Sequence, residues 1–134
     1  MAEGKGPGTA TVLVVEDEEA ARRYVVTVLR AEGYVVLDAA DAAAAGKAAT
    51  RFGVPVDLLV ADYVLPDGDG AAVAAALRPL FPRMKVLFVS GHIQEEVVQK
   101  GVSEEAFKKG AAFLQKPFSA EDLVRKVRAI LRGS

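Results

Sequence analysis

The chain has 134 residues, of which 51% are apolar and 26% are charged, and this size and composition are typical of one folded domain and exclude a disordered chain. The formal net charge of −1 provides no general attraction to nucleic acid or to an anionic membrane, so we expect neither as a partner. Because cysteine is absent and no apolar run approaches the roughly 20 residues that span a bilayer, the sequence excludes disulfides, thiolate zinc sites and a membrane helix, and we expect a cytoplasmic protein.

The first residues, "MAEGKGPGTA", are rich in glycine and lack the apolar middle of a signal peptide. We interpret residues 1–10 as a flexible tail or a remnant of an expression vector. The folded domain is therefore expected over residues 11–132.

Five short apolar runs are predicted to be strands. Each is brief, rich in β-branched residues and apolar on both faces, as the strands of a covered parallel sheet are. The runs are Val12–Val15, Val35–Leu37, Leu58–Val60, Val86–Val89 and the weaker Ala111–Leu114.

Segments with helical periodicity alternate with these strands. They are Glu18–Glu32, Asp41–Arg51, Ala71–Leu80, a less regular stretch over 93–110, and a last helix that begins near Ser119. Asp41 and Ser119 are predicted N-caps, and Gly33 is a predicted helix stop. The alternating order is (βα)5, which predicts an α/β fold: a doubly wound, five-stranded parallel sheet of flavodoxin-like topology.

Polar side chains follow four of the five predicted strands. Glu16 and Asp17 follow the first, Asp62 the third, Ser90 the fourth and Lys116 the fifth, so we expect them at one edge of the sheet. Clustered carboxylates require compensating positive charge, which Mg²⁺ can supply. A lysine and a hydroxyl can bind phosphoryl oxygens, and one carboxylate can act as the nucleophile that forms an acyl phosphate.

The motifs "LVVEDEE", "DLLVADYVLPDGDG", "VLFVSGH" and "FLQKPF" together resemble the receiver domain of two-component signalling, over residues 11–132. The segments "VLFVSG" and "AAFLQKPFSAEDLVRKVRAIL" are most similar in sequence to receivers attached to hybrid sensor histidine kinases. The resemblance implies a phosphorelay role in which a histidine kinase or phosphotransfer protein is the partner.

The resemblance also implies a role for each matching residue. Asp62 is the expected phosphoacceptor, Lys116 pairs with a phosphoryl oxygen, and Ser90 with Phe113 forms the switch. Pro117 is expected to follow a cis peptide bond. The expected output is a conformational change of the face built from the fourth helix, the fifth strand and the last helix, and a homodimer through this face is left open.

The metal ligands implied by the resemblance belong to the same edge. Asp17 and Asp62 are expected to bind Mg²⁺ directly, Val64 through its backbone carbonyl, and Glu16 through a metal-bound water. The implied protein is a signalling domain rather than an enzyme, although it assists its own phosphorylation and dephosphorylation.

Departures from the family pattern leave alternatives. Glu16 replaces the commoner aspartate. Because both residues occur in active receivers, we interpret this replacement as an adjustment of the activity of the site and not as its loss. Tyr63 stands where an aliphatic residue is commoner, which could alter access to Asp62, and the stretch 101–110 looks longer than usual. These two features favour a phosphorylation-independent pseudo-receiver. A flavodoxin-like FMN protein is disfavoured because the four acids of Glu16–Glu19 would repel the cofactor phosphate.

The remaining acids have simpler interpretations. Glu18 and Glu19 are expected to begin the first helix, where the positive helix end favours them. Asp67 and Asp69 are interpreted as turn residues, because the spacing of a calcium loop is broken at Ala71.

Overall fold

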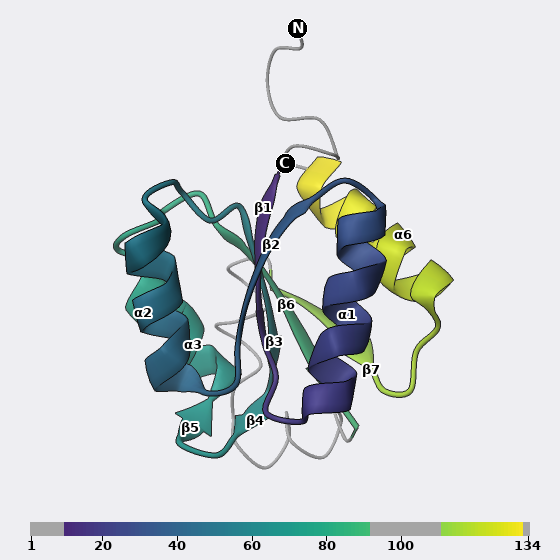
Figure 1. The fold of residues 1–134 in the computed structure, drawn as a ribbon, viewed down its shortest axis with the longest axis horizontal. Coiled ribbons are helices and arrows are strands. Elements are labelled where there is room, and N and C mark those ends of the chain that lie inside the picture. The colour runs from purple at the N-terminus through teal and green to yellow at the C-terminus, as the bar shows by residue number, and fades with distance from the viewer. Residues whose placement is uncertain (1–9, 92–110, 133–134) are drawn as a thin grey trace, which may run out of the picture.

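A five-stranded parallel sheet forms the centre of the computed structural model, which describes residues 10–91 and 111–132 (Figure 1). Its strands are β1 (Thr11–Val15), β2 (Val35–Ala39), β3 (Leu58–Asp62), β6 (Lys85–Ser90) and β7 (Ala112–Gln115). The order across the sheet is β2-β1-β3-β6-β7, which is the order of flavodoxin-like doubly wound sheets. The predicted fold class is therefore confirmed.

Helices cover both faces of this sheet (Figure 1). Those that the structure describes are α1 (Glu19–Ala31), α2 (Ala42–Phe52), α3 (Gly70–Leu77) and α6 (Ala120–Arg132). Helices α1 and α6 lie on one face, and α2 and α3 lie on the other. The predicted helical stretch over 93–110 lies outside the described residues. Within the described parts of the chain, no helix has the length and apolar character needed to cross a bilayer.

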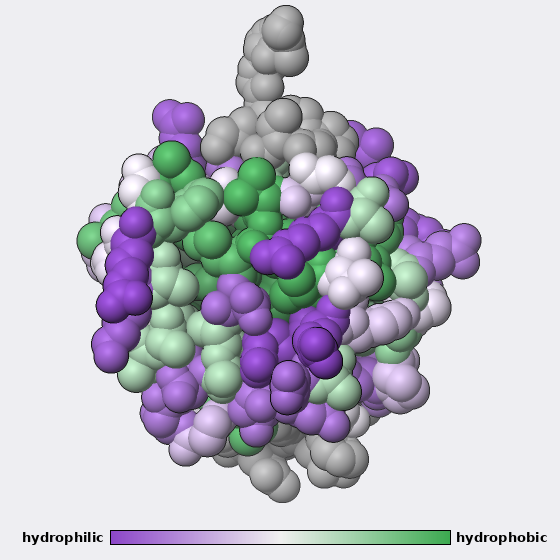
Figure 2. Space-filling view, in the orientation of Figure 1, coloured by the Kyte–Doolittle hydropathy of each residue, from purple (hydrophilic) through white to green (hydrophobic). Residues whose placement is uncertain are grey.

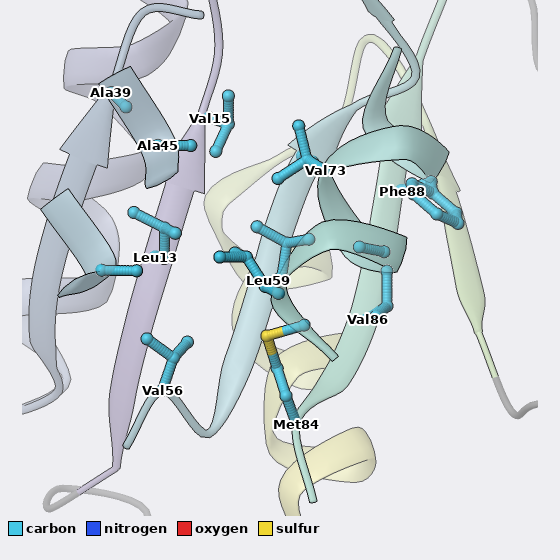
Figure 3. Packing of buried hydrophobic residues seen from close by; sticks show 14 of the residues in the cluster. Leu13, Val15, Ala39, Ala45, Val56, Leu59, Val73, Met84, Val86 and Phe88 are labelled. Atoms are coloured by element: carbon cyan, nitrogen blue, oxygen red, sulfur yellow. The ribbon is translucent and has the colours of Figure 1, made fainter. Parts of the chain in front are cut away.

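Strand β1 divides the core into two layers. Its side chains alternate between the faces, as the two-residue period of a strand requires. Leu13 and Val15 pack beneath α2 and α3, near Val73, as Figure 3 shows. Val12 and Val14 pack beneath α1 and α6. All of β1 is buried, and each fully buried valine or leucine contributes about 1.5–3 kcal/mol to stability, so the central strand is firmly held.

The ends of the helices are fixed by the predicted caps. Asp41 Oδ1 accepts from the Ala44 N–H at 2.8 Å, and Ser119 Oγ accepts from the Asp122 N–H at 3.0 Å. Gly33 follows α1 with a φ of 95°, a left-handed conformation that glycine adopts without strain. These local signals set where α1, α2 and α6 begin or end.

A short antiparallel hairpin follows β3 and was not predicted. It consists of β4 (Val64–Leu65) and β5 (Gly68–Asp69), with Pro66 and Asp67 at its tip. Asp67 therefore lies in a turn, as predicted, whereas Asp69 belongs to the strand β5. Asp69 Oδ1 then accepts from the Ala72 N–H at 2.8 Å and caps α3.

An arginine side chain covers part of the outer edge of the sheet at β2. Arg30 on α1 donates from Nη2 to the Val36 carbonyl oxygen at 3.0 Å. Val35 at the start of β2 is exposed, as is Phe52, which lines the same hollow as Arg30 and Val36, and Figure 2 shows apolar surface between α1 and α2. Because an open edge strand is a template for pairing with another chain, a charged side chain there discourages self-association.

We therefore expect Arg30→Ala to lower the free energy of unfolding by about 1 kcal/mol, since one hydrogen bond is lost. We also expect it to increase self-association through the uncovered β2 edge. Urea unfolding and sedimentation at several protein concentrations measure the two effects. Arg23→Ala, an exposed position on the same helix, is the control. Equal behaviour of the two variants in both measurements would contradict this role for Arg30.

Candidate functional site

Three carboxylates meet at the carboxyl edge of the sheet. Glu16, Asp17 and Asp62 each offer one oxygen, and these oxygens lie within 4.8 Å of one another. The cause is the parallel register of β1 and β3, in which Val15 lies opposite Ala61, so that the residues after each strand become neighbours. Glu16 is buried and Asp17 is exposed. The structure thus brings together the acids that the sequence placed at one edge.

Lys116 joins two of these acids. Its Nζ donates to Glu16 Oε1 at 2.5 Å and to Asp62 Oδ2 at 3.0 Å. Its backbone N–H donates to the Ser90 carbonyl oxygen at 2.8 Å, which fixes the start of the segment after β7. The peptide bond from Lys116 to Pro117 is cis, as expected. The lysine therefore reaches from β7 across the sheet edge to the end of β1.

Burial and ion pairing have opposite effects on the pKa values of Glu16 and Lys116. Burial raises the pKa of Glu16, while the hydrogen bonds from Lys116 and from the Glu18 N–H partly counteract the rise. Burial lowers the pKa of Lys116, but its hydrogen bonds to Glu16 and Asp62 and the negative charge of these two residues together outweigh burial, so its pKa lies above the ordinary value. The lysine is therefore protonated at neutral pH. This single ammonium faces three carboxyl groups and cannot by itself balance the negative charge of all of them.

The backbone around Asp62 is held from several sides. The Val64 N–H donates to Asp62 Oδ1 at 3.0 Å, and the Gly70 N–H donates to the Tyr63 carbonyl oxygen at 3.0 Å. A Cβ at position 70 would lie 2.7 Å from the Asp62 carbonyl oxygen, so only glycine fits there without a shift of the backbone. Asp62 thus presents its carboxylate from a closely packed support.

Ser90 and Phe113 lie on neighbouring strands. Ser90 is the last residue of β6 and is buried, next to Val89, which lies opposite Asp62 in the register. Phe113 on β7 lies opposite Phe88, and the two ring centroids are 5.4 Å apart. The residues assigned to the expected switch therefore lie on one side of Asp62, while the adjoining stretch 93–110 lies outside the described residues.

The Tyr63 ring lies in the core rather than at the mouth of the site. Only 1% of Tyr63 is exposed, and its ring meets Phe88 edge-on at 5.4 Å. The expectation that this side chain could alter access to Asp62 is therefore wrong. This removes one of the two features that favoured a pseudo-receiver.

An apolar pocket of about 220 Å³ lies beside Lys116 and was not predicted from the sequence. Helix α1 forms one wall and the segment after β7 forms another, with Tyr24 and Phe118 among the lining side chains. Tyr24 is 44% exposed. The apolar residues that line the pocket come from segments far apart in the sequence, so no local sequence pattern indicates the pocket.

The chemistry of the cluster suits a hard divalent cation. Carboxylate oxygens are the ligands that Mg²⁺ prefers, and it is usually held by one or two carboxylates together with waters. Glu16, Asp17 and Asp62 provide oxygen donors of this kind within 4.8 Å of one another. The part of the chain that the structure describes contains no other such group of acids or histidines.

Comparison with known proteins gives a consistent result. The sequence model of the protein family "Response regulator receiver domain" matches residues 12–128. The sensor kinase CckA of Brucella abortus (strain 2308) is 37% identical over 124 residues, which are 92% of this chain but only 13% of the kinase. The response regulator receiver protein CpdR of the same strain is 30% identical over 120 residues, covering 90% of this chain and 95% of CpdR.

A solved structure agrees with these relatives. The crystal structure of the receiver domain from the hybrid histidine kinase CckA superposes with a TM-score of 0.74 at 31% identity. The match covers 91% of this chain and 99% of that domain. The predicted similarity to receivers of hybrid kinases is confirmed.

Proposed function

The chain belongs to the family of response regulator receiver domains, and from this premise we propose that it accepts a phosphoryl group on Asp62 in a Mg²⁺-dependent reaction. The donor is a histidine kinase or a phosphotransfer protein, and the domain comprises residues 11–132 in the cytoplasm. The observation that supports this most directly is the contact of Lys116 Nζ with Asp62 Oδ2, at 3.0 Å, inside the acidic cluster.

Asp62 acts as the nucleophile in this proposal. One of its carboxylate oxygens forms a bond to phosphorus while the bond from phosphorus to the donor's histidine nitrogen breaks, and the electron pair of that bond returns to the nitrogen. The Lys116 ammonium, already beside Asp62, pairs with a phosphoryl oxygen. The Ser90 hydroxyl, at the end of β6, moves towards the transferred phosphoryl group and binds it.

Four residues would hold the metal. Asp17 and Asp62 would provide carboxylate oxygens and Val64 its backbone carbonyl, and buried Glu16 would act through a water rather than directly. When bound, Mg²⁺ supplies positive charge that offsets the acids and the phosphoryl oxygens. The negative charge that Lys116 alone does not balance supports the assignment of this cluster as a cation site.

Magnesium is expected to stabilise the folded protein, because the ion binds the native arrangement of acids. At a concentration about ten times its Kd, the gain in the free energy of unfolding is about 1.4 kcal/mol. Asp17→Asn should lose most of this gain, since it removes the exposed carboxylate ligand. Urea unfolding with Mg²⁺ or with EDTA measures it. Glu19→Gln, an acid in the first turn of α1, is the control, and an equal gain in both variants would contradict the assignment.

The function is tested by incubating the protein with Mg²⁺ and a small phosphodonor and measuring its intact mass. We expect a gain of about 80 Da, the mass of one phosphoryl group, and no gain when EDTA replaces Mg²⁺. An unchanged mass under all conditions would contradict the proposal and favour a phosphorylation-independent interaction module.

The signal is proposed to be a shift between two conformations. Capture of the phosphoryl group by Ser90 favours the state in which Phe113 turns inward. The surface that changes comprises β7, α6 and the stretch 93–110, for which the sequence predicts a helix and which lies outside the described residues. Proteins that dock on this face, including a second copy of the chain, would read the change. The domain is thus a signalling module that assists its own phosphorylation and dephosphorylation.

A further inference from the structure

We propose that Asp67 is a positioning residue that holds the Val64 carbonyl in place by fastening the tip of the β4–β5 hairpin to the start of α2. This inference rests on the proposed function, because the Val64 carbonyl is one of the proposed Mg²⁺ ligands. Asp67 itself is not a ligand of the ion.

Asp67 makes two hydrogen bonds across the structure. Its Oδ1 accepts from the Ala42 N–H at 2.9 Å, and its Oδ2 accepts from the Ala43 N–H at 3.1 Å. These N–H groups belong to the first turn of α2, where a helix has no partners of its own for them. The next N–H, of Ala44, donates to Asp41. Two acids from separate segments therefore share one helix end.

The charge of Asp67 suits this position. The N–H groups of Ala42 and Ala43 lower the pKa of its carboxyl group, with the bond from Ala42 acting most strongly. The carboxylate is therefore ionised at neutral pH, and it lies at the positive end of the α2 dipole. Both interactions favour the same docked position of the hairpin tip.

The hairpin connects this anchor to the acidic cluster. Val64 pairs with Asp69, and Leu65 pairs with Gly68. The base is held by the bond from the Val64 N–H to Asp62 Oδ1. Two-residue strands are too short to be rigid alone, so an anchor at the tip decides how well Val64 keeps its place.

The expected consequence concerns metal affinity. Mg²⁺ requires nearly ideal octahedral geometry, so it tolerates little displacement of a ligand. Residues that orient metal ligands typically change affinity by 10- to 100-fold. Because Val64 is one of several ligands, we expect the lower end, so that Asp67→Ala weakens Mg²⁺ binding about tenfold.

A matched control separates positioning from simple helix capping. Asp41→Ala removes a cap from the same first turn of α2 but leaves the hairpin tip attached. If Asp67 only stabilises α2, both variants lose stability and neither changes the metal site. If it positions Val64, the two variants lose comparable stability but only Asp67→Ala loses affinity for Mg²⁺.

The experiment is a calorimetric titration of the full chain with MgCl₂ at neutral pH, for wild type, Asp67→Ala and Asp41→Ala. We expect the Kd of Asp67→Ala to rise about tenfold, and that of Asp41→Ala to stay within about twofold of wild type. Equal Kd values for the two variants would overturn the inference.

Asp67→Asn keeps one acceptor oxygen and serves as the second variant in case Asp67→Ala fails to fold. Its Kd should lie between those of wild type and Asp67→Ala, and a Kd equal to that of wild type would overturn the inference. A wild-type protein that binds no Mg²⁺ would overturn the proposed function itself. That outcome differs from a metal-binding wild type whose affinity does not depend on Asp67.

Discussion

Asp62→Asn is expected to abolish phosphoryl incorporation, whereas wild type gains about 80 Da under the same conditions. The amide has nearly the same shape as the carboxylate but carries no negative charge, so its oxygen is a poor nucleophile towards phosphorus. The Lys116 ammonium keeps Glu16 as a charged partner, which favours retention of the local structure. Intact mass after incubation with Mg²⁺ and a small phosphodonor measures the result.

The control for this variant is Asp122→Asn. Asp122 is an exposed acid in the first turn of α6, so the substitution removes a carboxylate of the same kind outside the acidic cluster. This variant should gain the same mass as wild type. A gain in Asp62→Asn equal to that of Asp122→Asn would show that another residue is the acceptor.

Lys116→Ala is expected to slow phosphoryl incorporation by about 100-fold or more. Removing a single preorganised hydrogen-bond donor from a reacting site typically lowers the rate by about 100- to 1,000-fold. Lys116 contacts both Glu16 and Asp62, so the site also loses the cation that orders its carboxylates. The initial rate of mass gain at fixed Mg²⁺ measures the effect. Lys47→Ala, on the exposed side of α2, is the control, and a Lys116→Ala rate within tenfold of that control would contradict this role.

The same variant is expected to lose stability in the absence of metal. Glu16 is buried, and without Lys116 its carboxylate has lost a charged hydrogen-bond partner, a change that costs about 2 kcal/mol. Mg²⁺ should restore part of this loss because it supplies positive charge to the same carboxylates. Urea unfolding with EDTA and with Mg²⁺ measures both effects, and a Lys116→Ala variant as stable as wild type in EDTA would contradict the proposed charge balance.

The central parts of the fold were predictable because their signals are local. Each strand of the covered parallel sheet is apolar on both faces, and Asp41 and Ser119 are caps that a sequence shows directly. The third helix was predicted over Ala71–Leu80 but ends at Leu77. The reason is Pro79, which has no backbone N–H to donate to the carbonyl four residues earlier, so the helix cannot continue through it, although Arg78 still has helical backbone angles. The β4–β5 hairpin escaped prediction because two-residue strands show no periodicity.

The acidic cluster was predictable for a different reason. Residues that follow parallel strands collect at one edge, so Glu16, Asp17 and Asp62 could be placed together from chain order alone. What the sequence could not show is the direction of individual side chains. The buried Tyr63 ring and the reach of Asp67 to α2 depend on contacts between segments far apart in the chain. Such contacts exist only once the sheet and helices have packed.

The central claim is that a phosphoryl group is carried by the carboxylate of Asp62. After incubation with Mg²⁺ and a small phosphodonor, reduction with borohydride converts an aspartyl phosphate to homoserine, and peptide mapping by mass spectrometry locates the converted residue. We predict conversion at position 62 alone, and only when Mg²⁺ and phosphodonor are both present. A phosphoryl group found on a hydroxyl or histidine side chain, or conversion at a different aspartate, would contradict the account.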